Sequence, residues 1–431
     1  MAPATRECEL VPVRAAGERR SVAAGELVLV SGGEHVGTLA AVRALRDAGY
    51  EPWVAVSTRG AYAARSRAAA GAIEVPDPAE DDEGFAAALA GAARRIEASV
   101  VLPGTEAGLL ALSERTGKFP ADTALGVCPS GVVLGATDKA LLVRLASAAG
   151  LAAPPTIALD AREAPERGLP FPFPAVVKPP RSELRTPEGA IRHAGARRVD
   201  SPEELRSALA ALPAGRGLVQ PYLAGCLASL AGVFWDGRIL GAVQSVADRI
   251  WPEHCGTMSY ATTVPLDARL TASVGDLLGA LGWKGLFQVD FIDRGGSCVL
   301  IDLNPRIYTS LAIATAAGLN LPAIWVDLLR GRTPAGVGAY RLGVRYRHDE
   351  DDARALLALW RRGSRRTALR GSLPRRRTVH AVFSIRDPLP LLTTVAKLGR
   401  RGRPAGREPG VCAHPVRQRH EARGEADDAP R

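Results

Sequence analysis

Blocks of apolar residues alternate with helical patterns near the start of the chain and predict strands joined by helices. The segment 26–56 (ELVLVSGGEHVGTLAAVRALRDAGYEPWVAV) predicts a strand, a turn, a helix and a second strand, with Leu39, Val42 and Leu45 at helical spacing. Residues 98–112 (ASVVLPGTEAGLLAL) repeat the order of strand, turn and helix. Strands that alternate with helices form parallel sheets with right-handed crossovers. The pattern therefore predicts an N-terminal α/β domain.

The turn at 31–37 (SGGEHVG) is comparable to a nucleotide-binding loop, because backbone amides at a helix N-terminus hold anions. It lacks the full GxGxxG pattern, however, and no acidic residue stands where a ribose partner is expected. An ordinary tight turn is the favoured interpretation, and nucleotide binding is the alternative.

The pattern changes near Pro129, after which helices and strands no longer alternate regularly. The segment TDKALLVRLASAAG predicts a helix that ends at Gly150, and FPAVVK predicts a short buried strand. Further elements are predicted in the order helix 202–211, strand 217–223, strands within 228–264, helix 269–281 and helix 309–330. Beyond residue 335 the signal weakens, and 400–431, rich in Arg, Pro, Gly and Ala, is predicted to be disordered.

One hairpin places acidic residues within a strongly apolar pattern. Residues 285–306 (GLFQVDFIDRGGSCVLIDLNPR) predict two strands joined by a turn. If the pairing is centred near Gly296, Asp290 lies opposite Asp302 and on the same face as Asn304, since side chains alternate along a strand. Two facing carboxylates destabilise a sheet, whereas Mg²⁺ prefers such oxygen ligands. The three residues therefore indicate either a metal site or a solvated face of the sheet.

Composition places the chain among ordinary globular proteins. It has 431 residues, of which 47% are hydrophobic and 23% are charged, and this length suggests two to four domains. No stretch approaches the ~18–20 apolar residues that span a bilayer, and residues 1–26 lack the apolar core of a secretory signal. Six cysteines without a CxxC pair indicate neither a disulfide framework nor a zinc site. A cytoplasmic enzyme is expected.

The positive charge is confined to the C-terminal part. The net charge is +10, but residues 361–431 hold 18 Lys and Arg against 6 Asp and Glu, so the first 360 residues carry −2. The segment 387–403 (DPLPLLTTVAKLGRRGR) suits an anionic membrane surface or an acidic partner, or is a helix packed on the body with a solvated end. Nucleic-acid binding is not expected, because Phe383 is the only aromatic residue of this basic part.

The acidic hairpin resembles the closing motif of the ATP-grasp superfamily, particularly its carboxylate–amine ligase and carbamoyl-phosphate-synthase-like branch. In FQVDFIDRGGSCVLIDLNPRIYTSLAIATAAGLN, as in that family, an acidic position on one strand precedes an acid-x-Asn-Pro-Arg motif on the next. The likeness extends back through TDKALLVRLASAAGLAAPPT, FPAVVKPP and GLVQPYLAG, in the family's order, and covers about residues 125–332.

The resemblance implies an α/β and α+β fold, in which a Rossmann-like pre-ATP-grasp domain precedes a two-lobed ATP-grasp fold. The implied divisions are 1–125 for the first domain, 126–212 for the small lobe, 213–335 for the large lobe and 336–431 for a C-terminal extension.

The resemblance also assigns roles to individual residues. The implied metal ligands are Asp290, Asp302 and Asn304, with Mg²⁺ as the ion and Mn²⁺ as the alternative. The implied ATP contacts are Lys139, Lys178, Gln220, Tyr222 and Leu223. The two lysines are notable because only five of the 55 basic residues are lysine. Arg306 follows the motif's Asn and would neutralise a phosphoryl group or a substrate carboxylate, with a structural ion pair as its alternative role.

Three features depart from the family pattern, and one of them is Asp302, which is shorter than the more usual Glu. The loop after the second lysine (PPRSELRTPEG) has a single glycine, Gly189, and two arginines, Arg181 and Arg185, which either replace backbone amides around the phosphates or mark a degraded lid. Cys226 stands where the family often has an acidic ribose contact.

The irregular segment ADRIWPEHCGTMSYATT is the candidate for acyl-substrate recognition, because loops on a rigid scaffold tend to carry specificity. Arg249 and His254 are its candidate functional residues. His254 is either a general base for an incoming amine or a structural histidine.

The expected activity is therefore that of an ATP- and Mg²⁺-dependent ligase. Such an enzyme activates a small-molecule carboxylate as an acyl phosphate and joins it to an amine, with release of ADP and phosphate. The alternative is an ATP-binding sensor or scaffold that has lost its catalytic activity. In that case, its basic tail would associate with a membrane surface.

Overall fold

The computed structural model describes residues 25–58, 60–163, 168–185 and 191–400. The predicted disorder of 401–431 and the last basic residues of 387–403 lie outside these ranges, as does most of the segment 1–26. Chain contacts divide the protein into a large unit, Met1–Thr394, and a short unit, Val395–Arg431. The elements described below, up to the start of the last helix, belong to the large unit.

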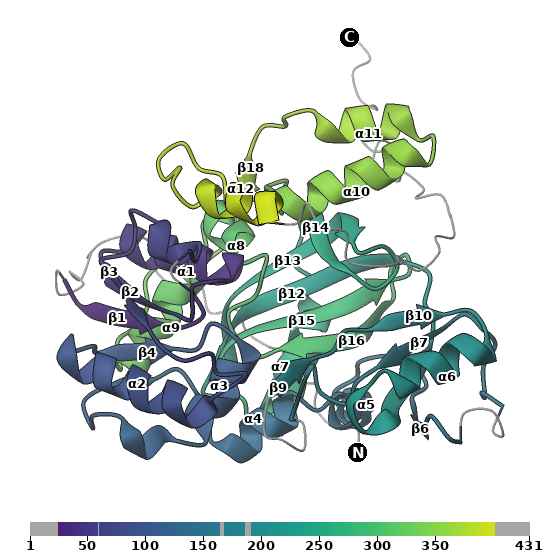
Figure 1. Cartoon of the computed structure of the whole chain (residues 1–431), viewed down its shortest axis with the longest axis horizontal. Coiled ribbons are helices and arrows are strands. Elements are labelled where there is room, and N and C mark those ends of the chain that lie inside the picture. The colour runs from purple at the N-terminus through teal and green to yellow at the C-terminus, as the bar shows by residue number, and fades with distance from the viewer. Residues whose placement is uncertain (1–24, 59, 164–167, 186–190, 401–431) are drawn as a thin grey trace, which may run out of the picture. The chain divides into compact units, whose positions relative to one another are not determined.

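Five parallel strands with helices on both faces form the N-terminal sheet, as the sequence predicts (Figure 1). The strand order is β3-β2-β1-β4-β5, and the elements are β1 (Leu27–Val30), α1 (Val36–Asp47), β2 (Glu51–Val56), β3 (Gly71–Glu74), α2 (Asp82–Arg95), β4 (Val100–Leu102), α3 (Glu106–Ser113) and β5 (Ala124–Leu125). Side chains alternate along β1, so Val28 and Val30 share a core with α1, whereas Leu29 shares one with α2 and α3.

The turn at 31–37 is a tight connection between β1 and α1. The N–H of Gly33 donates to the carbonyl of Ala55 at 3.2 Å. Gly37 lies against the backbone of Tyr308, where a Cβ atom would come within 2.4 Å of the carbonyl oxygen. Only glycine allows this approach, so Gly37 serves the close packing of the N-terminal domain on the remainder of the large unit.

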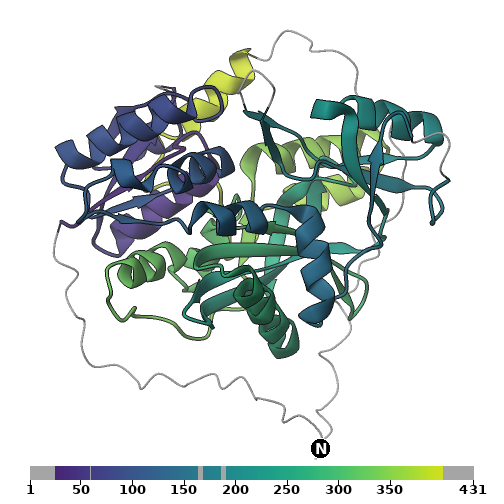
Figure 2. The ribbon, with the colours of Figure 1, turned by 90° about the horizontal axis from the view of Figure 1, so that it is seen from below.

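An antiparallel sheet of four strands forms the small lobe, and α6 lies along one face of it (Figure 2). The strand order is β10-β7-β11-β6, and the elements are β6 (Ile157–Asp160), β7 (Ala175–Lys178), β10 (Arg197–Val199), α6 (Pro202–Ala210) and β11 (Arg216–Pro221). A separate hairpin comprises β8 (Glu183–Arg185) and β9 (Ile191–His193). β11 pairs with β6 and β7, so this strand completes the small-lobe sheet although the predicted boundary at residue 213 assigned it to the large lobe.

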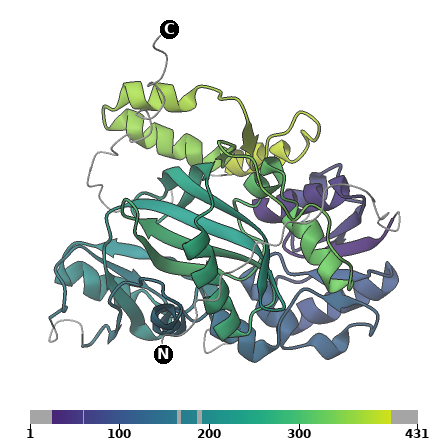
Figure 3. The same cartoon turned by 180° about the vertical axis from the view of Figure 1, so that it is seen from behind.

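Seven strands form the central sheet of the large lobe. Their order is β16-β15-β12-β13-β14-β17-β18, and they are β12 (Cys226–Trp235), β13 (Arg238–Trp251), β14 (Thr257–Val264), β15 (Gly285–Asp293), β16 (Cys298–Asn304), β17 (Arg345–Arg347) and β18 (Thr378–His380). One face shares a core with α4 (Ser130–Ala136), α5 (Lys139–Ala148) and α7 (Ala268–Leu281), and α7 is seen across the sheet in Figure 3. The other face packs against α8 (Ala312–Ala317), α9 (Leu321–Leu329) and α1.

The prediction of one continuous helix over 309–330 is wrong, because the segment forms two helices, α8 and α9. Gly318 follows α8 with a left-handed φ of 106°, and Asn320 then caps α9 by accepting a hydrogen bond from the N–H of Ala323. Pro322 lies in the first turn of α9, where a missing N–H costs nothing. The apolar periodicity is the same for one buried helix as for two. Only Gly318, Asn320 and Pro322 indicate in the sequence that one helix ends and another begins.

The segment after residue 335 is more ordered than its weak pattern indicates. It contributes β17 and β18 to the large sheet and forms α10 (Asp349–Arg361), α11 (Arg365–Ser372) and α12 (Leu391–Arg400). In the first turn of α12, Thr393 is buried and donates a hydrogen bond to the carbonyl of Gly60 at 2.7 Å. Among the described residues, no helix has the length and apolarity needed to cross a membrane.

Asp387 connects the C-terminal segment to the N-terminal domain. Its carboxylate accepts hydrogen bonds from Arg43 Nε at 2.9 Å, from Ser66 Oγ at 2.6 Å and from the N–H of Arg67 at 2.9 Å. Burial alone would raise the pKa of Asp387, but these donors outweigh it and hold the pKa below its ordinary value.

We expect Asp387→Asn to lower the free energy of unfolding by about 2 kcal/mol at neutral pH, because a buried, charge-assisted network loses its anion. A depressed carboxyl pKa stabilises the fold above the unfolded-state pKa, so the difference between wild type and variant should shrink as the pH falls below about 4. Urea unfolding at several pH values measures it, with the exposed Asp47→Asn as the control. A difference that does not depend on pH would contradict the ionic role of Asp387.

Candidate functional site

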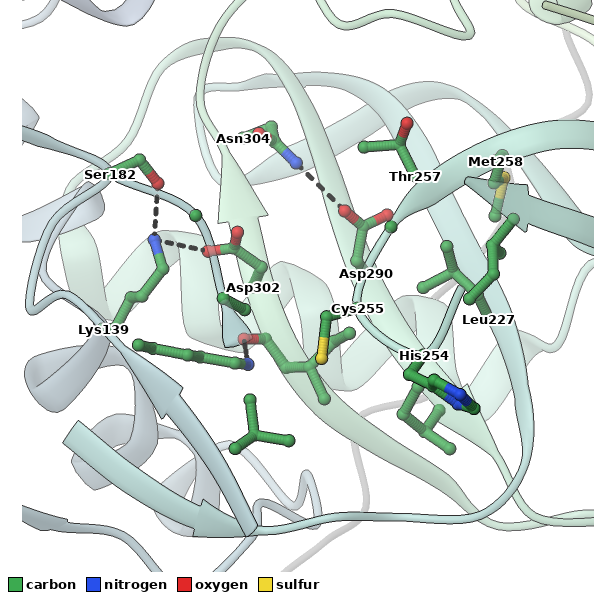
Figure 4. Close-up of a pocket in the computed structure, with 18 of the residues that line it drawn as sticks. Lys139, Ser182, Leu227, His254, Cys255, Thr257, Met258, Asp290, Asp302 and Asn304 are labelled. Atoms are coloured by element: carbon green, nitrogen blue, oxygen red, sulfur yellow. Dashed lines mark hydrogen bonds and ion pairs between the residues drawn. The ribbon is translucent and has the colours of Figure 1, made fainter. Parts of the chain in front are cut away.

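A cavity of about 310 Å³ lies between the small-lobe strands β7 and β11 and the hairpin of β15 and β16 (Figure 4). Ten of the twelve residues predicted for the site line it, namely Lys139, Lys178, Gln220, Tyr222, Leu223, His254, Asp290, Asp302, Asn304 and Arg306. The first and the last of these residues, Lys139 and Arg306, are more than 160 positions apart in the chain. The two predicted residues that do not line it are Arg181 and Arg249.

The two strands of the hairpin bring the acidic residues together in the register predicted from the sequence. Asp290 of β15 pairs directly with Asp302 of β16, and Gln288 pairs with Asn304. Asn304 donates its Nδ2–H to Asp290 Oδ2 at 3.0 Å, as Figure 4 shows. Burial, with a further contribution from the nearby Asp302 carboxylate, raises the pKa of Asp290 to about 8. Asp290 is thus a carboxylate that needs a compensating cation to be charged at neutral pH.

This donor set fits a hard divalent cation. Asp290 and Asp302 supply carboxylate oxygens from facing positions, and Asn304 supplies a carboxamide oxygen once its amide turns from Arg306, whose Nη2 now lies 3.3 Å away. Oxygen ligands of this kind suit Mg²⁺ and Mn²⁺, whereas structural zinc sites use mostly Cys and His. Within the described ranges, no group of three or more His, Cys, Asp and Glu side chains is arranged to hold a metal.

Two buried lysines lie beside Asp302 and come from different elements. Lys139 is the first residue of α5, and its Nζ lies 3.1 Å from Asp302 Oδ1 and 2.9 Å from Ser182 Oγ (Figure 4). Lys178 ends β7 and donates from Nζ to the carbonyl of Ile301 at 3.1 Å. Burial lowers the pKa of Lys178, and the carboxylate of Asp302 opposes this shift. Lys139, Lys178 and Arg306 therefore lie around Asp290 and Asp302 before any ligand binds.

The segment between the two lobes forms another wall of the cavity. Gln220 of β11 is almost completely buried and donates from Nε2 to Thr156 Oγ1 at 2.9 Å. The N–H of Tyr222 donates to the carbonyl of Pro174 at 2.9 Å. The ring of Tyr222 is covered by the guanidinium of Arg198, whose carbon lies 4.7 Å from the ring centroid. This wall combines apolar surface with fixed backbone groups.

His254 lies against this wall and not beside the two aspartates of the hairpin. Its Nδ1 is 3.2 Å from the hydroxyl of Tyr222, and it adopts a left-handed φ of 74° in the turn between β13 and β14. Figure 4 shows His254 next to Cys255 and Leu227, on the other side of the cavity from Lys139 and Asn304. The predicted role of His254 as a base for an incoming amine has no support from this position.

Arg249 and Arg181 are engaged in ion pairs away from the cavity. Arg249 donates to both carboxylate oxygens of Asp352 in α10, at 2.6 and 3.1 Å, and stacks on Tyr260. Arg181 Nη2 lies 3.2 Å from Asp138 Oδ2, at the cap of α5. The structure thus gives Arg249 a structural partner that lies 103 residues later in the chain, in a helix the sequence pattern did not reveal.

One acidic residue near the site was missed by sequence reasoning. Glu106 begins α3 in the N-terminal domain, is 6% exposed, and its Oε1 has no hydrogen-bond partner among the described residues. Burial raises the pKa of Glu106, and the charges of Arg306 and Lys139 oppose the shift. The available signal was an acidic residue in a helix that is otherwise apolar, in the sequence EAGLLAL.

No family model and no curated protein matches this chain. Among solved structures it is similar to N5-carboxyaminoimidazole synthetase from Staphylococcus aureus complexed with ADP, with a TM-score of 0.56 and 13% identity over 74% of this chain and 81% of that chain. It is also similar to L-amino acid ligase from Bacillus licheniformis, with a TM-score of 0.53 and 16% identity over 71% and 74% of the two chains.

A third similar structure is the biotin carboxylase domain of 2-oxoglutarate carboxylase from Hydrogenobacter thermophilus, in complex with MgADP, ADP and bicarbonate. The TM-score is 0.53 and the identity 16%, over 74% of this chain and 73% of that chain. The strand orders of the sheets and the hairpin of β15 and β16 agree with the fold expected from the sequence motifs. The similar solved structures agree with it as well. The chain therefore has the ATP-grasp fold.

Proposed function

We propose that this protein is an ATP- and Mg²⁺-dependent ligase that activates a carboxylate as an acyl phosphate and joins it to an amine. The observation that carries the proposal is the pair of facing carboxylates, Asp290 and Asp302, in a cavity that also contains Lys139, Lys178 and Arg306. In such a cavity the cationic side chains can bind a polyphosphate while the carboxylates bind a divalent cation. Phosphoryl transfer depends mainly on positioning and charge neutralisation, which these groups would provide.

Asp290, Asp302 and Asn304 would hold the ion, which supplies positive charge to the phosphate oxygens. Lys139 would then be drawn from Asp302 to the phosphates, since the cation takes over the pairing of that carboxylate. Lys178, which donates to the carbonyl of Ile301, would be the second lysine on the phosphates. Three similar structures, described above, include one complexed with ADP and one with MgADP, which supports this choice of nucleotide.

Gln220, Tyr222 and Leu223 would bind the base of ATP. Their wall offers backbone groups for hydrogen bonds and an apolar surface for an aromatic ring. His254 and Arg198 lie against the same tyrosine, so we assign them to this end of the cavity. This assignment replaces the role in acyl-substrate recognition that the sequence suggested for His254.

In the proposed first step, a carboxylate oxygen of the substrate attacks the γ-phosphorus of ATP, and the bond to the β-phosphate oxygen breaks to release ADP. In the second step, the amine nitrogen attacks the acyl carbon, phosphate leaves, and the amine loses a proton. Arg306 lies 3.3 Å from Asn304 and would neutralise the carboxylate or the acyl phosphate. Water would have to be excluded from the cavity during these steps, because it would otherwise hydrolyse the acyl phosphate.

Hydroxamate formation from ATP, Mg²⁺, hydroxylamine and a panel of carboxylates, including amino acids, tests the proposal. Hydroxylamine traps an acyl phosphate, so the natural amine need not be known. We expect at least one carboxylate to give a hydroxamate and ADP in equal amounts. Tight binding of ATP without any hydroxamate across the panel would contradict the proposal and support a nucleotide-binding sensor.

Replacement of the second lysine gives a further prediction. We expect Lys178→Met to lower kcat/KM for ATP by about 10²- to 10³-fold, because methionine fills the space but supplies no charge to the phosphates. The measurement is hydroxamate formation as a function of ATP concentration. Lys284→Met is the control, since Lys284 stacks on Trp235 and pairs with Asp236 outside the cavity. Equal losses in both variants would contradict the assigned role of Lys178.

A further inference from the structure

Exposed apolar side chains are concentrated in one part of the chain. Of the eleven large apolar side chains that are exposed in the described residues, nine fall between residues 357 and 395. Leu369 is 56% exposed, Leu373 is 59% exposed and Ile385 is 86% exposed. Single exposed apolar residues are common on protein surfaces, but their accumulation in one segment marks an interaction site.

Four of these nine side chains, Leu357, Trp360, Leu369 and Leu373, lie in or beside a stretch that is rich in arginine. Residues 361–377 (RRGSRRTALRGSLPRRR) contain eight arginines and no acidic residue, and no Asp or Glu occurs from 353 to 386. We call residues 357–377 the arginine–leucine surface; they comprise the end of α10, α11 and the residues up to β18 (Figure 1). Its positive charge contrasts with the nearly neutral first 360 residues.

The packing of the two helices leaves these side chains outside. Asp352 and Ala355 are buried on the inner face of α10, whereas Leu357 and Trp360, three residues apart, are exposed on another face. α11 packs inward through Ala368 and Gly371, and a Cβ atom on Gly371 would lie 2.6 Å from a methyl group of Leu356. The leucine and the arginines of α11 are therefore exposed because the helix packs through its opposite face, and not because this part of the chain lacks a core.

We propose that the arginine–leucine surface docks on the surface of an anionic lipid bilayer. Arginine and leucine alternate along α11 and beyond it, as in Arg366, Leu369, Arg370 and Leu373, all of which are exposed. A bilayer interface accommodates this mixture, since arginines reach the lipid phosphates while leucine and tryptophan enter the headgroup boundary. The binding is peripheral, and the electrostatic part increases with the charge of the lipids.

Charge argues against a second copy of the chain as the occupant. In a two-fold symmetric dimer, the same patch on both subunits would bring seven arginines besides Arg362 against seven others, and the patch itself contains no acidic residue to pair with them. The surface is also fixed next to the cavity, because Arg362 forms an ion pair with Glu253, which precedes His254 in the chain. Docking would thus hold the cavity close to the membrane surface.

Co-sedimentation of the full chain with vesicles tests the proposal. We use phosphatidylcholine vesicles with or without about 30% phosphatidylglycerol, at low ionic strength and after addition of salt. We expect binding only to the anionic vesicles, and weaker binding with salt. The variant Arg366→Gln/Arg370→Gln/Arg375→Gln should bind at least roughly tenfold more weakly. Its control is Arg238→Gln/Arg269→Gln/Arg294→Gln, which removes the same charge from exposed positions elsewhere.

A second pair of variants separates insertion from charge. We expect Leu369→Gln to weaken binding about threefold or more while leaving the net charge unchanged, and the exposed Leu342→Gln to have no effect. Absence of binding by the full chain, or equal binding by the two arginine variants, would overturn the proposal. A concentration-dependent dimer that Leu369→Gln abolishes would instead assign the surface to a second copy. Binding of polyglutamate without binding of anionic vesicles would assign it to an acidic partner.

Discussion

Asp302→Ala is expected to lower the rate of hydroxamate formation at least about 10³-fold at saturating ATP. Asp302 faces Asp290 across the hairpin and pairs with Lys139, so its removal would delete a proposed ligand for the divalent cation and leave a buried lysine without its counter-ion. Charge stabilisation in a water-excluded site is usually the largest single contribution to catalysis, which is why the effect should exceed that of Lys178→Met. The measurement is hydroxamate formation with the best carboxylate from the panel.

The control for this prediction is Asp276→Ala, on the exposed side of α7, which should retain full activity. Asp302→Asn provides a second variant that keeps the shape of the side chain, so a loss of activity in a folded protein remains interpretable. Far-ultraviolet circular dichroism establishes the folding of each variant. If Asp302→Asn forms hydroxamate at the wild-type rate over a range of Mg²⁺ concentrations, Asp302 is not a ligand for the ion.

Asp352→Ala is expected to lower the free energy of unfolding by about 3–5 kcal/mol. Asp352 is 1% exposed and forms ion pairs with Arg249 at 2.6 Å and with Arg347 at 3.1 Å, and both arginines also stack on Tyr260. Removal of the carboxylate leaves two cations in a mostly buried position, which is far more costly than loss of a surface ion pair. Urea unfolding measures the change, and the exposed Asp276→Ala is the control.

A combined variant tests the cause of this effect. Arg249→Met/Arg347→Met/Asp352→Leu removes all three charges together, and we expect it to recover most of the stability that Asp352→Ala loses. In addition, Arg249→Met should leave the KM for ATP unchanged, because Arg249 does not line the cavity. A triple variant that is as unstable as Asp352→Ala would show that packing around Asp352, and not unpaired charge, explains the loss.

Local patterns predicted the elements that carry the proposed chemistry. The helix expected at 269–281 is α7 at Ala268–Leu281, and the facing positions of Asp290 and Asp302 follow from the alternation along two strands and the position of their turn. Such features depend on residues close in sequence, whose spacing directly determines which side chains share a face. The resemblance to the ATP-grasp family then assembled these pieces into a fold, which the comparisons with solved structures confirm.

Other features depended on contacts between distant parts of the chain. The amphipathic pattern of 309–330 is compatible with one buried helix or with two, and the left-handed Gly318 decides for two. Arg249 was expected to contact a substrate, but its guanidinium donates hydrogen bonds to Asp352. Asp352 belongs to α10, a helix that the sequence pattern did not predict.

The local elements, the facing aspartates and, through the motifs, the fold thus followed from the amino-acid sequence. The position of His254 against Tyr222, the burial of Glu106 and the exposure of the arginines of α11 became known only from the folded structure. The physical reason is that periodicity reports which face of an element is buried, but not which partner it meets. Contacts between residues that are far apart in the chain depend on how whole helices and strands pack together, and no single segment determines this packing.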